Sequence, residues 1–192
     1  MKAFHKYVTL AALAVLPVVA SAFPIAIAGT EGLGVFVTGT DSIIATYQGN
    51  SAAYSNDLYL SLDAVSTPAG TFVFNNHTSP VGSTVNLGSF AVGTELIFRL
   101  HVSNTGYDYY TGAASRNPDG DTHARVQSNW QPNETLVSFE DLFGTPEGVN
   151  GYNDLSFSFT NTTSAPSVPE PASIALFSVG LLGLGLLKRK MK

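Results

Sequence analysis

Residues 155–160, Leu-Ser-Phe-Ser-Phe-Thr, alternate apolar and polar side chains without interruption. Successive side chains of a β-strand point to opposite faces of its sheet, so a period of two is typical of a strand with one buried face. We therefore expect Leu155, Phe157 and Phe159 to enter a core, and the three polar side chains to face solvent. Residues 97–102 alternate in the same way.

Similar short runs recur through the middle of the chain, separated by Gly, Asn, Asp and Pro. No stretch there sustains a helical period, and seven or more short strands in one domain favour two packed sheets. The sequence thus predicts an all-β fold, an antiparallel two-sheet sandwich over residues 29–160. The expected strands are 33–37, 43–47, 58–63, 71–75, 96–102, 136–140 and 155–160, and the expected core also contains Leu58, Leu60, Phe98, Leu100 and Phe139.

The N-terminus has the features of a secretory signal peptide, formed by an N-terminal signal helix. Lys2 and Lys6 precede an apolar run over residues 7–20 that is too short to span a bilayer. Ala20 and Ala22 supply the small-x-small pattern that signal peptidase reads, which predicts a signal peptide over residues 1–22. Residues 26–28, Ala-Ile-Ala, repeat that pattern, so a cut after Ala28 is an alternative.

The C-terminus has three parts in a fixed order. Residues 161–171 are polar and proline-containing, which predicts a linker. Residues 172–187 carry no charge and would rise about 24 Å as a helix, close to a hydrocarbon core of about 30 Å. We expect a single transmembrane helix there, with residues 188–192 as a basic cytoplasmic tail.

This C-terminal order resembles the PEP-CTERM sorting signal. Pro169, Glu170 and Pro171 form the motif, because two prolines hold the chain extended for a processing enzyme. The resemblance implies recognition by an exosortase, a transpeptidase-like membrane enzyme of Gram-negative bacteria that make exopolysaccharide. The protein is then expected to cross the inner membrane, to be held there transiently, and to reach the cell surface or extracellular matrix. A permanent single-span anchor is the other interpretation.

The charge of the middle region limits its partners. Residues 23–167 contain three arginines, no lysine and thirteen acids, a formal balance of −10. Such a domain is poorly suited to nucleic acid, whose backbone is itself negative. The chain has no cysteine, so thiolate catalysis and thiolate metal sites are excluded.

Acids cluster in three loops of the second half of the domain. Residues 117–121 read Asn-Pro-Asp-Gly-Asp, residues 139–142 Phe-Glu-Asp-Leu, and residues 152–154 Tyr-Asn-Asp. Oxygen ligands from separate loops can converge on Ca²⁺, and we expect these loops to meet at one end of the sandwich. Two interpretations stay open, a metal site or acids that form turns and cap strands, and Arg116 and Arg125 are alternative partners for the acids. The candidate metal ligands are Asn117, Asp119, Asp121, Glu140, Asp141, Asn153 and Asp154.

These three motifs, in this order, resemble an uncharacterised acidic β-sandwich family of bacterial calcium-rich and other surface proteins. The resemblance covers roughly residues 90–160 and implies a calcium-binding surface domain. The loop over residues 144–151 holds fewer acids than that family's pattern.

Two classes of function follow. The first is a structural or binding component of the surface or biofilm matrix, with signal peptidase and exosortase as processing partners and exopolysaccharide or other surface proteins as ligands. The second is a small secreted polysaccharide-acting enzyme with paired carboxylates, which glycosidases place about 5–10 Å apart. The sequence has no Gly-x-Ser-x-Gly nucleophile motif, and His77, His101 and His123 are expected to be surface or loop histidines. We predict the non-catalytic class.

Overall fold

Strands make up nearly all the regular structure of the computed structural model, which describes residues 22–61, 70–144 and 151–164. The elements are β1 (Val35–Val37), β2 (Ile43–Gly49), β3 (Asn56–Ser61), β4 (Thr71–Asn75), β5 (Thr84–Gly88), β6 (Glu95–Val102), β7 (Tyr107–Tyr110), the 3-10 helix η1 (Ala114–Arg116), β8 (Ala124–Gln131), β9 (Glu134–Phe139), β10 (Leu155–Thr160) and β11 (Thr162–Thr163).

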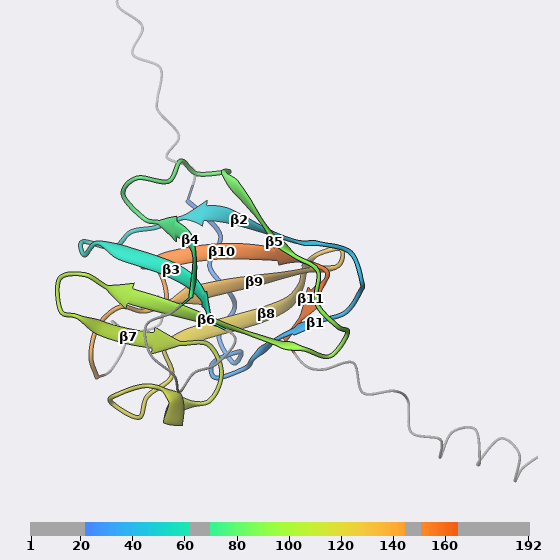
Figure 1. The fold of residues 1–192 in the computed structure, drawn as a ribbon. Helices are drawn as coiled ribbons and strands as arrows, with labels where there is room; N and C mark the ends of the chain where they lie inside the picture. Colours follow the sequence, from blue (N-terminus) through green and yellow to red (C-terminus); the bar gives the residue numbers. More distant parts are fainter. Residues whose placement is uncertain (1–21, 62–69, 145–150, 165–192) are drawn as a thin grey trace, which may run out of the picture.

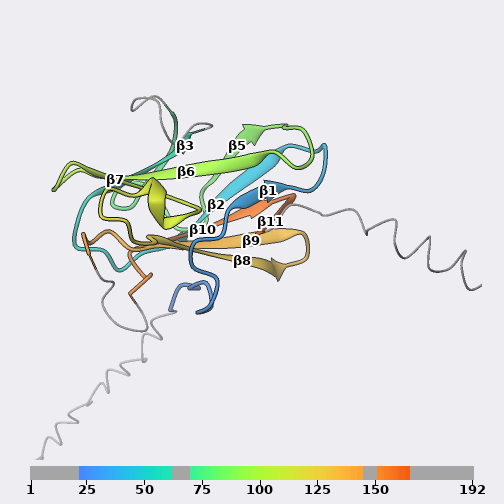
Figure 2. The same ribbon diagram turned by 90° about the horizontal axis from the view of Figure 1, so that it is seen from below.

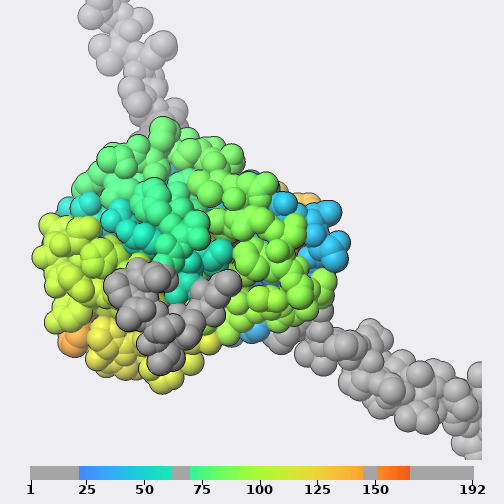
Figure 3. Space-filling model, in the orientation of Figure 1, coloured from blue at the N-terminus to red at the C-terminus, as the bar shows by residue number. Residues whose placement is uncertain are grey.

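The strands form two sheets. One has the order β5-β2-β10-β9-β8, and the other has the order β11-β1-β6-β3-β4 with β7 also paired to β6. All the strand pairs are antiparallel. The sheets lie face to face as two layers (Figures 1 and 2), and strands β3 to β7 of the chain make up most of the surface seen in Figure 3. The predicted antiparallel two-sheet architecture is confirmed.

Aromatic rings join the two sheets. Phe98 of β6 stacks on Phe159 of β10 with ring centroids 4.0 Å apart. Phe74 of β4 stacks on Phe157 of β10 at 5.8 Å. The eight side chains predicted for the core are all buried, so the period of two identified the inward faces correctly. Burying a large apolar side chain of this kind stabilises a fold by about 1.5–3 kcal/mol.

Strand β10 differs from the prediction on its second face. Ser156 and Ser158 were expected to face solvent, yet their exposed fractions are 0% and 2%. Ser158 Oγ accepts a hydrogen bond from the Gln48 side-chain amide of β2 (2.9 Å). Near Ser156 lies a segment that we call the N-terminal strap, residues 23–31, which runs across the outer face of the five-stranded sheet (Figures 1 and 2). The Ala26 N–H donates to Ser138 Oγ (2.8 Å), and the Ser138 and Ser156 hydroxyls lie 2.7 Å apart.

Some predicted segments lie outside the described residues. Residues 1–21 of the predicted signal peptide (residues 1–22), most of the predicted linker and the segment over residues 172–192 are among them. Within the described part, no helix is long and apolar enough to cross a membrane. The strap and β11 extend the packed domain on either side of residues 29–160.

Candidate metal centre

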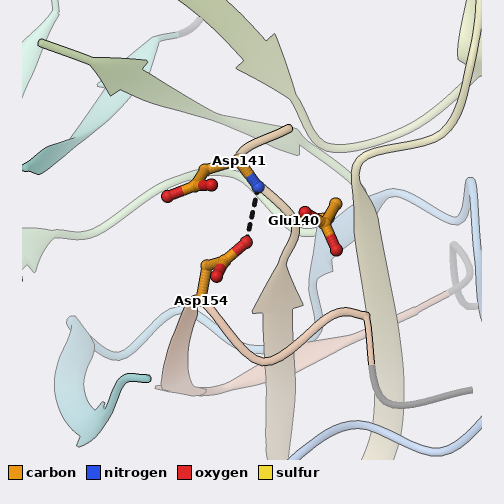
Figure 4. A group of neighbouring side chains, drawn as sticks. All are labelled: Glu140, Asp141 and Asp154. Atoms are coloured by element: carbon orange, nitrogen blue, oxygen red, sulfur yellow. Dashed lines mark hydrogen bonds between the residues drawn. The ribbon is translucent and has the colours of Figure 1, made fainter. Parts of the chain in front are cut away.

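Three carboxylates meet where β9 leaves the sheet and β10 re-enters it. Glu140 and Asp141 follow the last residue of β9, and Asp154 directly precedes β10. The Asp154 N–H donates to the Phe139 carbonyl oxygen (3.1 Å), which holds the two strand ends together. One ligand atom from each of Glu140, Asp141 and Asp154 lies within 4.8 Å of the others (Figure 4). We call these three residues the acidic triad.

Hydrogen bonds from the chain orient each carboxylate of the triad. The Asp141 N–H donates to Asp154 Oδ2 at 2.7 Å, as Figure 4 shows, and the Leu142 N–H donates to Glu140 Oε1 at 3.2 Å. The Asn56 side-chain amide donates to Asp141 Oδ2 at 2.6 Å. Because Asn56 begins β3, this last contact ties the triad to the opposite sheet. The geometry of the triad therefore depends on both layers of the sandwich.

The pKa of Asp154 is raised by the surroundings of its carboxyl group. Burial, followed by the negative charges of Asp141 and Glu140, raises the pKa of Asp154 to about 8, although the hydrogen bond from the Asp141 N–H opposes the shift. The Asp154 carboxyl therefore holds a proton at neutral pH when no cation is bound. A divalent cation would offset the same repulsion in place of the proton.

A cavity of about 250 Å³ gives access to the triad. Asp141 and Asp154 lie in its wall together with Asn153, which was also predicted as a ligand. Glu140 and Asp141 are only 1% and 4% exposed, so the cavity reaches a largely buried group. Its remaining wall residues are Ser51, Ala53, Tyr54 and Leu142.

Asp119 has a different set of partners from the triad. Its Oδ2 lies 2.7 Å from His123 Nε2 and accepts a hydrogen bond from the Gly144 N–H (2.9 Å), while its Oδ1 accepts from the Asp121 N–H (3.1 Å). Burial favours a raised pKa, but these donors and the nearby imidazole outweigh it and lower the pKa of Asp119. Asp119 is thus ionised at neutral pH and holds its loop to Gly144 and His123.

His123 is buried, which the sequence did not indicate. It lies in the loop before β8, which agrees with the expectation of a surface or loop histidine, but it is only 1% exposed. Its Nδ1 lies 3.0 Å from the Glu140 carbonyl oxygen, which can only accept, and its Nε2 faces the Asp119 carboxylate. Both ring nitrogens of His123 thus face oxygen atoms of neighbouring residues. The ring stacks on Tyr109 with centroids 3.7 Å apart.

The remaining candidates shape the loop over residues 117–121. Asn117 Oδ1 accepts from the Tyr110 N–H (2.8 Å), and Asn117 Nδ2 donates to the Asp121 carbonyl oxygen (2.6 Å). The Asp121 side chain is exposed. The turn-forming interpretation fits Asn117, Asp119 and Asp121, which lie outside the triad. Arg116 forms an ion pair with Glu95, and Arg125 forms one with Glu31.

Comparison with known proteins identifies one part of the chain. Residues 167–190 match the model of the PEP-CTERM protein-sorting motif. The motif implies an exported protein that exosortase processes and that associates with the membrane or cell surface, which confirms the coarse prediction from Pro169, Glu170 and Pro171. No curated protein and no solved structure matches the chain, and the sandwich is not assigned to a family.

Proposed function

We propose that the exported sandwich is a non-catalytic module of the cell surface or extracellular matrix that binds Ca²⁺ at the acidic triad. The observation that supports the proposal is the approach of Glu140, Asp141 and Asp154 to within 4.8 Å beside an accessible cavity. Exopolysaccharide and neighbouring surface proteins are the proposed partners, since the PEP-CTERM motif directs the domain to the compartment where these are found.

The donor set favours a hard cation. The triad offers only carboxylate oxygens, and the chain has no cysteine. Soft or borderline metals prefer sulfur and imidazole, whereas Ca²⁺ takes about six to eight oxygens, including carboxylates, carbonyls and waters. Mg²⁺ requires near-ideal octahedral geometry. A site at the two ends of the loop between β9 and β10 supplies that geometry less readily. Water in the cavity beside Asp141 and Asp154 would complete the coordination of Ca²⁺.

A cation here would strengthen one end of the fold. Glu140 and Asp141 are tied to β9, Asp154 to β10, and Asn56 brings in β3 of the other sheet. The cation would therefore join three strands from two layers through groups that otherwise repel one another. A protein without disulfides gains from such a cross-link outside the cell, where Ca²⁺ is abundant enough to occupy weak sites.

The enzymatic alternative receives less support from the same geometry. A polysaccharide hydrolase needs a cleft for several sugar rings, and small-molecule sites usually enclose about 300–1,000 Å³. The cavity at the triad measures about 250 Å³, and two of the three carboxylates are almost fully buried. These dimensions suit an ion and its waters better than a polymer. Absence of hydrolysis when the purified protein is incubated with the producing organism's exopolysaccharide would agree with this choice, and released sugars would contradict it.

Thermal unfolding with Ca²⁺ and with chelator tests the proposal. A ligand at a hundredfold excess over its Kd stabilises the folded state by about 2.7 kcal/mol, which raises the Tm by several degrees. Asp154→Asn and Glu140→Gln should remove the increase. Asp121→Asn is the matched control, because this acid lies in a neighbouring loop with an exposed side chain, and it should keep the increase. Coincident melts of the wild-type protein would refute calcium binding.

A further inference from the structure

The N-terminal strap is anchored along its whole length. At its start Phe23 packs on Gly49 of β2, where a Cβ atom would lie 2.6 Å from the Phe23 Cβ atom. In its middle the Ala26 N–H bonds to Ser138 Oγ, and the Ile27 N–H donates to Gln127 Oε1 (3.0 Å). The strap therefore has contacts on β2, β9 and β8 of the five-stranded sheet.

The end of the strap joins the edge of the sheet. The Thr30 carbonyl oxygen accepts a hydrogen bond from the Val126 N–H (3.0 Å), and Glu31 forms both an isolated antiparallel bridge and an ion pair with Arg125 of β8. The strap thus extends the hydrogen bonding of the five-stranded sheet beyond β8, in addition to covering its face.

Side chains on the outer face of the five-stranded sheet, over which the strap runs, are buried. Leu136, Ser138 and Ser156 lie on the outer face of the central strands, and each is 0% exposed. Ala26 is itself 1% exposed, whereas Ala28 is exposed. Removing residues 23–28 would take the Ala26 N–H donor from Ser138 Oγ and leave the Ser138 and Ser156 hydroxyls with only each other as partners.

We infer that signal peptidase cuts after Ala22, so that the mature protein begins at Phe23. A cut there leaves the strap whole, whereas a cut after Ala28 removes the part that carries Phe23 and Ala26. Ala26 is buried in the folded domain, which gives this alanine of the second small-x-small pattern a structural role. The inference depends on the packing of the strap and not on the cation at the triad.

The N-terminus of the exported full-length chain tests the inference. Mass spectrometry of the N-terminal peptide, after export in a Gram-negative host, should identify Phe23 as the first residue. Ala22→Arg should block processing, while the matched change Ala28→Arg should leave the start at Phe23. A mature chain that begins at Gly29, or processing that Ala28→Arg abolishes, would overturn the inference. This readout does not depend on how well a variant folds.

A second measurement tests the role of the strap itself. Ala26→Glu places a charge at a buried position and should increase the rate of protease digestion of the exported protein at least several-fold. Ala28→Glu changes an exposed position two residues away and should digest at the wild-type rate. Equal rates for Ala26→Glu and the wild-type protein would show that the strap is dispensable, and the reason for placing the cut after Ala22 would be lost.

Discussion

Replacing Asp119 by alanine should cost the domain a large part of its stability. The substitution removes the acceptor of three hydrogen bonds, from the Gly144 N–H, the Asp121 N–H and His123 Nε2, and the Asp119 and His123 side chains are 3% and 1% exposed. Removing one partner of a buried ion pair typically costs about 3–5 kcal/mol. We expect a loss in this range, out of the roughly 5–15 kcal/mol by which domains are stable.

Equilibrium urea unfolding measures this loss directly, from the shift in midpoint at constant slope. Asp121→Ala is the matched control, because it removes an exposed carboxylate two positions along the same loop, and it should change the free energy of unfolding by less than about 0.5 kcal/mol. Asp119→Asn should cost less than Asp119→Ala, because the amide oxygen still accepts a hydrogen bond. A loss below about 1 kcal/mol for Asp119→Ala, or equal losses for Asp119→Ala and Asp121→Ala, would refute the buried pair.

Three further predictions concern pH, the core and sorting. In calcium-free buffer the folded domain keeps the proton of Asp154, whose pKa is about 8, while the unfolded chain releases it near pH 4, so the free energy of unfolding should fall as pH rises from about 4 to about 8. Asp154→Asn should flatten that slope, and an unchanged slope would mean that Asp154 does not have the raised pKa. Phe159→Ala should cost about 3–5 kcal/mol in urea unfolding because it leaves a cavity against Phe98; a loss below about 1 kcal/mol would place Phe159 outside the core. Pro169→Ala with Pro171→Ala should leave exported protein with its C-terminal residues attached in an exosortase-containing host, as intact mass would show, and normal loss of the tail would rule out this motif as the sorting signal.

The core could be predicted from the sequence because alternation reports which side of a strand is apolar. Phe157 and Phe159 illustrate this, since both are fully buried and stack on rings from the opposite sheet. The same pattern could not predict the burial of Ser156 and Ser158. Their cover comes from residues more than 100 positions away, and a polar face looks the same in a sequence whether solvent or a strap lies over it.

Four strands escaped prediction for local reasons. Strand β5 has five residues, of which only Val85 and Leu87 are apolar, so its alternation is too short to stand out. Strand β8 has a register shift between Gln127 and Gln131, with Asn129 at a φ of 52°, and this irregularity breaks its period. Strands β7 and β11 have four and two residues, which is too short for a period to emerge.

The sequence predicted which residues form the candidate site, but it predicted only in part which of them lie close together in the fold. The proximity of Glu140 and Asp141 follows from their adjacency, and Asp154 joins them because antiparallel pairing of β9 and β10 brings those strand ends together. The separate role of Asp119 could not be foreseen, because it depends on a buried histidine four residues away in the loop before β8. Short acidic loops carry no signal that separates a turn former from a ligand.

Calorimetric titration of the purified, exported protein with Ca²⁺ measures binding at the acidic triad. We expect saturable binding of one ion, with proton release in weakly buffered solution at neutral pH because the proton of Asp154 must leave. We also expect Asp154→Asn to lose that binding and Asp121→Asn to retain it. Absence of binding at millimolar Ca²⁺, or equal binding by the wild-type protein and Asp154→Asn, would contradict a metal centre at Glu140, Asp141 and Asp154.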